Sequence, residues 1–351
     1  MILKESFSID HIDRMKKRYP SLDKQLIERT IFALGLLESL VKVEMPFIFK
    51  GGTSLMLLLQ KPFRLSTDID IIVEPDCNVD DYLAKASEIY PFLSVEEHVR
   101  VGKNSIVKKH FKYYYKSPTS EKEIPILLDI LFEHHGYDDL ANKEIKNEFL
   151  LTSGDNYKVL LPTIESLLGD KLTAFAPHTT GIEFEYVNEK GNRIEKTLEV
   201  IKQFLDVSQL VQEVKNPESV RRTYDNVVSS EIKYRGIDVT ADDCLKDAFK
   251  ATLSIISRGS LYKDDYKYFI TGIRKIQSHI FGFSVNGEVA YKFAAPVLLF
   301  IARMIKQTYD VPITTQTPFK EKNYRTINQI IKLDQTSFDT IATTLRMVDL
   351  S

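Results

Sequence analysis

Two adjacent glycines, Gly51 and Gly52, constrain the fold of this chain more than any other feature of its sequence. They follow a short β-type run at residues 47–49 and precede residues 53–60, an apolar stretch whose composition favours a buried helix. Residues without a Cβ permit a tight turn and let backbone N–H groups approach a bound group closely. The N-terminal end of the following helix adds partial positive charge at the same place. The pattern therefore predicts a strand–turn–helix unit that can receive an anion.

Three aspartates follow this unit on predicted strands. Asp68 and Asp70 are two positions apart beside the apolar run 69–73, so a strand would place both carboxylates on one face. Asp129 lies alone in the apolar run 124–132, where an unpaired ionised carboxylate would be costly. Grouped carboxylates bind hard divalent cations, so we predict that all three aspartates serve a Mg²⁺ or Mn²⁺ site. A Gly-Gly pair or a DxD alone is usually a turn or a solvated strand end, and only the combination indicates this chemistry.

The hydrophobic patterns change character near residue 160. A chain of 351 residues is long enough for two domains. Helix and strand patterns alternate over residues 1–160, which predicts an α/β (α+β) domain. Helical periodicity dominates residues 161–351 and predicts a mainly α-helical domain. The predicted elements there are helices over 164–175, 198–214, 241–257, 266–280, 293–307 and 324–333, with a hairpin over 182–195.

Composition excludes several classes of protein. The net charge of -2 excludes a protein that coats nucleic acid through bulk charge, although it leaves room for a local basic face. The only two cysteines, Cys77 and Cys244, provide neither a disulfide framework nor a zinc motif. The first residues lack the apolar segment of a secretory signal, and no later stretch is apolar enough to span a bilayer. We therefore expect a cytoplasmic protein with no membrane partner.

A basic and aromatic segment, KKHFKYYYK at residues 108–116, has two interpretations. In one, it is an RNA-facing strand whose lysines bind phosphates and whose tyrosines stack on bases, supported by the nearby Arg100 and Lys103. In the other, Phe111, Tyr113 and Tyr115 pack in a core and the lysines lie in water.

The combined pattern resembles the nucleotidyltransferase superfamily, which has the polymerase-β-like fold. The string FKGGTSLMLLLQKPFRLSTDIDIIV is similar to the AbiEii/AbiGii abortive-infection toxin family, through its KGGT-S/A-L opening and its R-x-S-x-D-I-D segment. Further along, LPTIESLLGDKLTAF resembles a family helix with a nucleotide-contacting lysine, here Lys171. KQFLDVSQL resembles a basic-x-x-x-Asp motif, here Lys202 and Asp206.

This resemblance implies a nucleotidyltransferase domain with a mixed sheet, followed by a helical domain that contributes to the cleft. It implies Mg²⁺-dependent transfer of a nucleoside monophosphate from an NTP, with the catalytic residues Asp68, Asp70, Asp129, Lys171 and Asp206. The implied nucleotide-binding residues are Lys50, Gly51, Gly52, Thr53, Ser54, Arg64, Ser66 and Lys171. The implied acceptor is the tRNA 3′ end or a protein hydroxyl. The implied biology is growth arrest or phage defence, with a cognate antitoxin as partner.

Two alternatives remain open at this point. The same chemistry could modify a small molecule, as it does in antibiotic-modifying relatives. The chain could also be a nucleotide-binding or protein-interaction module without catalysis. That second alternative would be favoured by a missing carboxylate or lysine, whereas Asp68, Asp70, Asp129 and Lys171 are all present.

Overall fold

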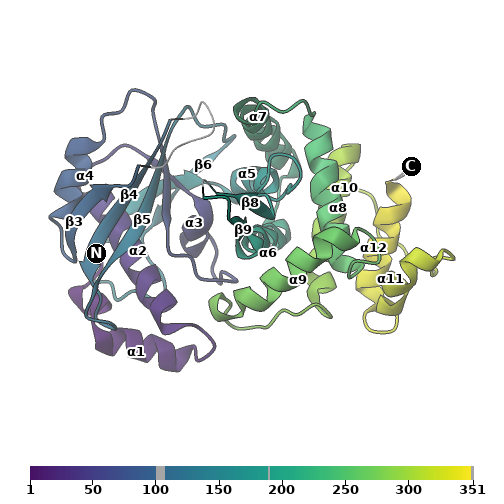
Figure 1. Ribbon diagram of the computed structural model, residues 1–351, viewed down its shortest axis with the longest axis horizontal. Coiled ribbons are helices and arrows are strands. Elements are labelled where there is room, and N and C mark those ends of the chain that lie inside the picture. The colour runs from purple at the N-terminus through teal and green to yellow at the C-terminus, as the bar shows by residue number, and fades with distance from the viewer. Residues whose placement is uncertain (100–106, 189, 349–351) are drawn as a thin grey trace. The chain divides into compact units, whose positions relative to one another are not determined.

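The computed structural model of the chain describes residues 1–99, 107–188 and 190–348. The chain divides into two compact units (Figure 1). Unit 1 comprises Met1–Thr163 and Ser278–Phe283, and unit 2 comprises Ile164–Gln277 and Ser284–Ser351. Within the described residues, no helix has both the length and the apolar character needed to cross a membrane.

Unit 1 is built around a five-stranded sheet with the order β1-β2-β5-β4-β3. Its strands are β1 (Ile48–Lys50), β2 (Ile69–Val73), β3 (Phe92–Glu97), β4 (Lys108–Lys116) and β5 (Glu123–Phe132). β2 and β5 pair in parallel, and all other neighbours pair antiparallel. The sheet is therefore mixed, and the predicted α/β fold class is confirmed.

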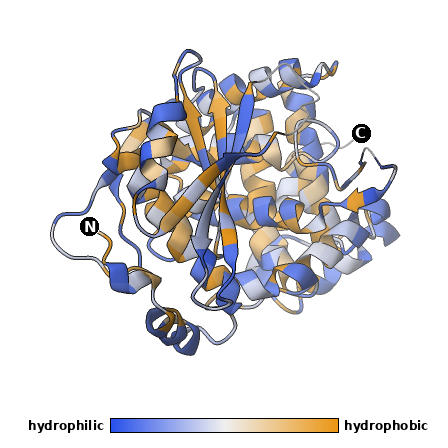
Figure 2. Cartoon of the chain, turned by 60° about the vertical axis from the view of Figure 1, so that its left-hand side comes forward, coloured by the Kyte–Doolittle hydropathy of each residue, from blue (hydrophilic) through white to orange (hydrophobic). Residues whose placement is uncertain are grey.

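The hydrophobic core of unit 1 lies between this sheet and helix α2 (Lys24–Lys42). Alternation along β4 sends Phe111, Tyr113 and Tyr115 into this core, where the Tyr115 ring stacks on Phe32 with centroids 3.8 Å apart. The core interpretation of these three aromatic residues is confirmed. The other face of β4 carries polar residues, and the strands of the sheet show both hydrophobic and hydrophilic colours in Figure 2.

The remaining elements of unit 1 surround this sheet. They are η1 (Lys4–Phe7), α1 (Ile9–Arg18), α3 (Gly51–Leu58), α4 (Asp80–Ser87), and the hairpin of β6 (Leu140–Glu144) and β7 (Lys158–Pro162). Residues 278–283 join this unit because Phe281 packs edge-on against Phe149 and Tyr19. Ile280 also forms an isolated β-bridge with Arg64.

Unit 2 is mainly helical, as the periodicity predicted. It contains α5 (Ile164–Ala174), α6 (Thr197–Glu213), α7 (Pro217–Arg235), α8 (Ala241–Ile256), α9 (Lys263–Lys275), α10 (Ala290–Lys306), η3 (Lys322–Tyr324), α11 (Arg325–Ile330) and α12 (Gln335–Met347). The predicted hairpin is present as β8 (Glu185–Val187) and β9 (Arg193–Glu195). The predicted helix over 266–280 was too long, because α9 ends at Lys275 and gives way to the 3₁₀ segment η2 (Ile276–His279).

Candidate active site on the sheet of unit 1

The glycine turn after β1 lies directly against the aspartate strand. Gly51 has a φ of +78°, which L side chains rarely adopt. A Cβ placed on Gly51 would lie 2.0 Å from Oδ2 of Asp70, so the carboxylate occupies the space that a side chain would fill. Glycine is required here both by the backbone conformation and by the close approach of Asp70. The two predicted motifs thus meet in space.

The second glycine is covered by the segment between α3 and β2. A Cβ on Gly52 would lie 2.7 Å from Nη2 of Arg64 and 2.9 Å from Oγ of Ser66. Arg64 is 6% exposed, and its Nη1 donates to the carbonyl of Leu65 at 3.1 Å. The structure therefore places Arg64 and Ser66, both predicted nucleotide-binding residues, beside the turn.

The two hydroxyl residues that open α3 are buried. Thr53 donates to the backbone carbonyl of Asp68 at 2.5 Å, and Ser54 donates to the carbonyl of Gly51 at 2.8 Å. The Thr53 bond ties the start of the helix to the residue that precedes β2. Because both side chains serve the protein itself in this structure, their predicted contact with a nucleotide phosphate stays a prediction.

Four polar side chains lie in one row across the sheet. The strand register pairs Lys50 with Asp70, Asp70 with Asp129, and Asp129 with His110. Paired residues on adjacent strands point to the same face. The parallel pairing of β2 with β5 thereby brings together two carboxylates that are 59 positions apart in the sequence. Both are half-buried, whereas Asp68 precedes β2 by one residue and is exposed.

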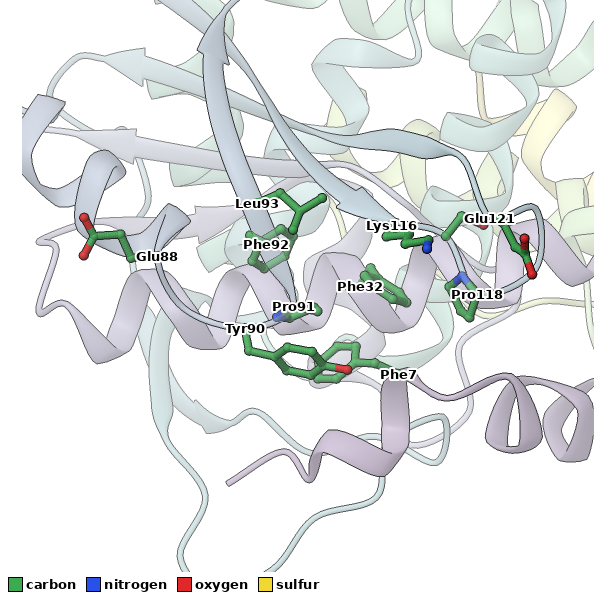
Figure 3. A pocket seen from close by; sticks show the side chains of 11 residues that line it. Phe7, Phe32, Glu88, Tyr90, Pro91, Phe92, Leu93, Lys116, Pro118 and Glu121 are labelled. Carbon is green, nitrogen blue, oxygen red and sulfur yellow. The ribbon is translucent and has the colours of Figure 1, made fainter.

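A cavity of about 110 Å³ opens on this row, and its lining includes Lys50, Asp70, Lys108, His110 and Asp129. Unit 1 also has a larger cavity of about 580 Å³, shown in Figure 3. That cavity is lined mainly by aromatic and apolar side chains, among them Phe7, Phe32 and Phe92, and contains none of the predicted site residues. The smaller cavity, which holds these titratable groups, is therefore the candidate active site.

His110 is a site residue that the sequence analysis missed. Its Nδ1 lies 2.7 Å from Oδ1 of Asp129. The alternation in KKHFKYYYK could have placed His110 on the face opposite the buried aromatics. The strand order, however, makes β4 the neighbour of β5, and no local sequence pattern indicates that order.

The site fits a metal ion that is shared with a substrate. Among the residues that the structure describes, no group of three or more His, Cys, Asp or Glu side chains could hold a metal. The predicted set Asp68, Asp70 and Asp129 therefore does not form a complete protein cage. Mg²⁺ is commonly bound by one or two carboxylates together with phosphate oxygens and water, and the neighbouring Asp70 and Asp129 match that donor set.

The Lys171 and Asp206 side chains form a buried ion pair within unit 2. Lys171 on α5 and Asp206 on α6 are 3.0 Å apart, and their side chains are only 7% and 2% exposed. Lys171 also donates to Oε1 of Gln203 at 3.1 Å. Lys171 and Asp206 are 35 positions apart in the sequence, and the β8–β9 hairpin lies between them. Packing of α5 against α6 brings the two side chains together. Lys202, one helical turn before Asp206, is half-buried.

Comparison with known families decides the class. A profile described as "Nucleotidyl transferase AbiEii toxin, Type IV TA system" matches residues 35–275, more than two thirds of the chain. The chain belongs to the AbiEii nucleotidyltransferase toxin family. Membership supports nucleotidyl transfer by a toxin as the activity class, with a nucleotide substrate and an antitoxin partner.

Solved structures give weaker similarities. JHP933 from Helicobacter pylori is 12% identical, with 82% of this chain and 94% of that chain covered at a TM-score of 0.45. A candidate nucleotidyltransferase from H. pylori is 14% identical, with 82% and 97% covered at a TM-score of 0.45. These similarities are too distant to say anything about activity. A search of curated proteins found no significant match.

Proposed function

We propose that this toxin transfers a nucleoside monophosphate from an NTP to an RNA hydroxyl in a Mg²⁺-dependent reaction. The 3′ end of tRNA is the acceptor to test first. Asp70 and Asp129 are paired on the adjacent strands β2 and β5, and the Asp70 carboxylate lies against Gly51. This arrangement supports the proposal most directly. Two carboxylates beside the N-terminal end of a helix suit a triphosphate with its cation.

Each part of the site then has a chemical task. Asp70 and Asp129 would hold Mg²⁺ together with the triphosphate, and Asp68 would contribute from the position just before β2. A bound ion would supply positive charge to offset the charge of the phosphates and of the pyrophosphate leaving group. The N–H groups of Gly51 and Gly52 orient the phosphates at the start of α3. Asp129 accepts the proton of the acceptor hydroxyl, whose oxygen attacks the α-phosphorus as the bond to pyrophosphate breaks.

In the same proposal Lys171 neutralises phosphate charge, and Asp206 holds the Lys171 ammonium in place. A lysine has four rotatable side-chain bonds, so a fixed carboxylate at 3.0 Å removes much of its freedom. Gln203 supplies a second acceptor for the same ammonium.

The acceptor is proposed to lie along β4. Lys108 and Lys112 share a face with His110 and Asp129, because alternate residues on a strand point the same way. Lys109 points to the other face, where it is 3.9 Å from Asp80. Tyr114 is the one tyrosine of β4 on the Asp129 face, and a hydrogen bond to Glu96 raises its pKa. Arg100 and Lys103 lie outside the described residues.

A transfer assay tests the proposal. Each α-labelled NTP is incubated with Mg²⁺, total tRNA and the protein, beside a variant that carries Asp70→Asn and Asp129→Asn. Label on tRNA with the wild type alone supports RNA nucleotidylation and identifies the base. Label on protein instead supports a protein hydroxyl as acceptor. No label on either contradicts the proposed acceptor and directs the search to small hydroxyl compounds or to a non-catalytic role.

A further inference from the structure

We propose that His110 is a positioning residue that fixes the Asp129 carboxylate in its working orientation. The inference rests on the proposed function, in which Asp129 contacts both the cation and the acceptor hydroxyl. Neither the family description nor the sequence pattern assigns a role to His110.

The contact between the two side chains is set by the sheet itself. His110 and Asp129 are register partners on β4 and β5, and the distance from Nδ1 to Oδ1 is 2.7 Å. The histidine side chain is 16% exposed and the aspartate side chain 39% exposed. The imidazole is therefore the more firmly enclosed partner, while the carboxylate faces the cavity.

The direction of this hydrogen bond follows from the chemistry of the two groups. An ionised carboxylate has no proton and can only accept, so Nδ1 of His110 carries the proton and donates. The bond uses one oxygen of Asp129 and leaves both lone pairs of Oδ2 for the cation and the acceptor hydroxyl. It also restricts rotation of the carboxylate about its terminal torsion, which is otherwise broad.

The surroundings of the pair make the histidine the suitable partner. Lys108 and Lys112 flank His110 on the same face of β4, and Asp70 and Lys50 complete the row on β2 and β1. A lysine bonded to Asp129 would place a full positive charge where a cation must bind. An imidazole N–H orients the carboxylate through a single hydrogen bond from a rigid ring. Groups that orient metal ligands are typically worth ~10–100-fold in metal affinity or activity.

The test compares His110→Ala with His110→Asn. Asparagine places an amide N–H close to the position of Nδ1 and keeps the donor, whereas alanine removes it. His134→Ala is the matched control, because His134 is 82% exposed and pairs with Glu74. Two quantities are measured: kcat and KM for nucleotide transfer, and the affinity for Mn²⁺ in the presence of an α,β-methylene NTP that cannot react.

We expect His110→Ala to lower kcat ~10–100-fold and to weaken Mn²⁺ binding ~10-fold, with the nucleotide KM within about threefold. His110→Asn should recover most of both losses, and His134→Ala should change neither. Wild-type values in His110→Ala, or an asparagine variant no better than alanine, would overturn the proposal.

The Mn²⁺ measurement separates this inference from the proposed function. If the wild type transfers nothing but His110→Ala still weakens Mn²⁺ binding and His110→Asn restores it, the RNA reaction is wrong and the positioning role stands. If the wild type transfers label and all three variants match it, the reaction stands and the positioning role is refuted.

Discussion

The sheet site of unit 1 and the Lys171–Asp206 pair of unit 2 both bring charged residues together, but in opposite ways. On the sheet, Asp70 and Asp129 are like charges, half-buried and open to a cavity. Lys171 and Asp206 are opposite charges that are almost fully buried. Two neighbouring carboxylates repel each other, which favours binding of a cation between them. In a buried ion pair each charge is already balanced by its partner. The first arrangement is suited to binding a cation, whereas the second stabilises the packing of α5 against α6.

The sharpest test of this comparison removes the carboxylates of the sheet. Asp70→Asn or Asp129→Asn should lower transfer by ~10³-fold, because several kcal/mol of charge stabilisation is lost. Thermal stability should stay level or rise, since a repulsion is also removed. Initial rates and thermal unfolding of both variants provide the measurement. A marked fall in stability would show that these carboxylates are structural instead.

The buried pair should behave in the opposite way. Lys171→Met leaves the Asp206 charge buried without its cation, which should lower the free energy of unfolding by ~3–5 kcal/mol. The double variant Lys171→Met, Asp206→Leu should recover much of that stability while nucleotide binding remains lost. Urea unfolding and nucleotide titration of both variants decide the matter. Wild-type nucleotide affinity in the double variant would reject the substrate role of Lys171.

The glycine turn offers a smaller and more local test. Gly51→Ala should cost ~1–2 kcal/mol for its left-handed backbone and more for the collision with Asp70. Gly154→Ala is the matched control, because Gly154 has a φ of +62° and open space around it. Unfolding and transfer are measured for both variants. We expect activity to fall only in Gly51→Ala. If both variants lose the same stability and both keep full activity, the Asp70 carboxylate can move away from the added Cβ without loss of function.

The basic face of β4 should affect RNA binding without affecting the fold. Replacing Lys108 and Lys112 by Gln should reduce the salt slope of single-stranded RNA binding by ~1.4, since each phosphate contact contributes about 0.7. Lys109→Gln, on the other face, is the control. Binding is measured over a series of salt concentrations. An unchanged slope in the double variant would remove β4 from the acceptor surface.

The smallest expected effect comes from an exposed pair in unit 2. The hydrogen bond that His178 Nε2 donates to the Asp265 carboxylate, at 3.0 Å, raises the pKa of His178. A histidine whose pKa is raised on folding stabilises the protein fully below its unfolded value and loses that contribution as the pH rises through the folded value. Because the His178 side chain is 57% exposed, the effect should stay below ~0.5 kcal/mol. His178→Gln should remove this loss of stability above about pH 6.5, measured as the free energy of unfolding against pH. If the variant shows the same pH dependence as the wild type, another group is responsible for it.

Several predictions from the sequence depended only on local patterns, and these were confirmed. The apolar runs at β1, β2 and β5 are strands, and the glycine pair opens a helix. The aromatic residues of β4 alternate into the core as their spacing indicated. Helix α7 was missed because Pro217–Arg235 is rich in polar residues, although Asn216 caps its start and Gly236 closes its end. The short strands β3, β6 and β7 were missed as well, since β3 and β6 bury almost no side chains and β7 has only five residues.

The sequence by itself pointed to the glycine pair, the aspartates and Lys171 as candidate site residues, because the backbone freedom of glycine and the charges of aspartate and lysine belong to the residues themselves. Tertiary structure alone decided which of them meet. Strand order made His110 the partner of Asp129 and Asp70 its neighbour, and helix packing joined Lys171 to Asp206. Hydrophobic periodicity fixes the face that a residue occupies, but not the element that lies beside it. Contacts between distant segments depend on how whole faces pack, which only the folded chain resolves.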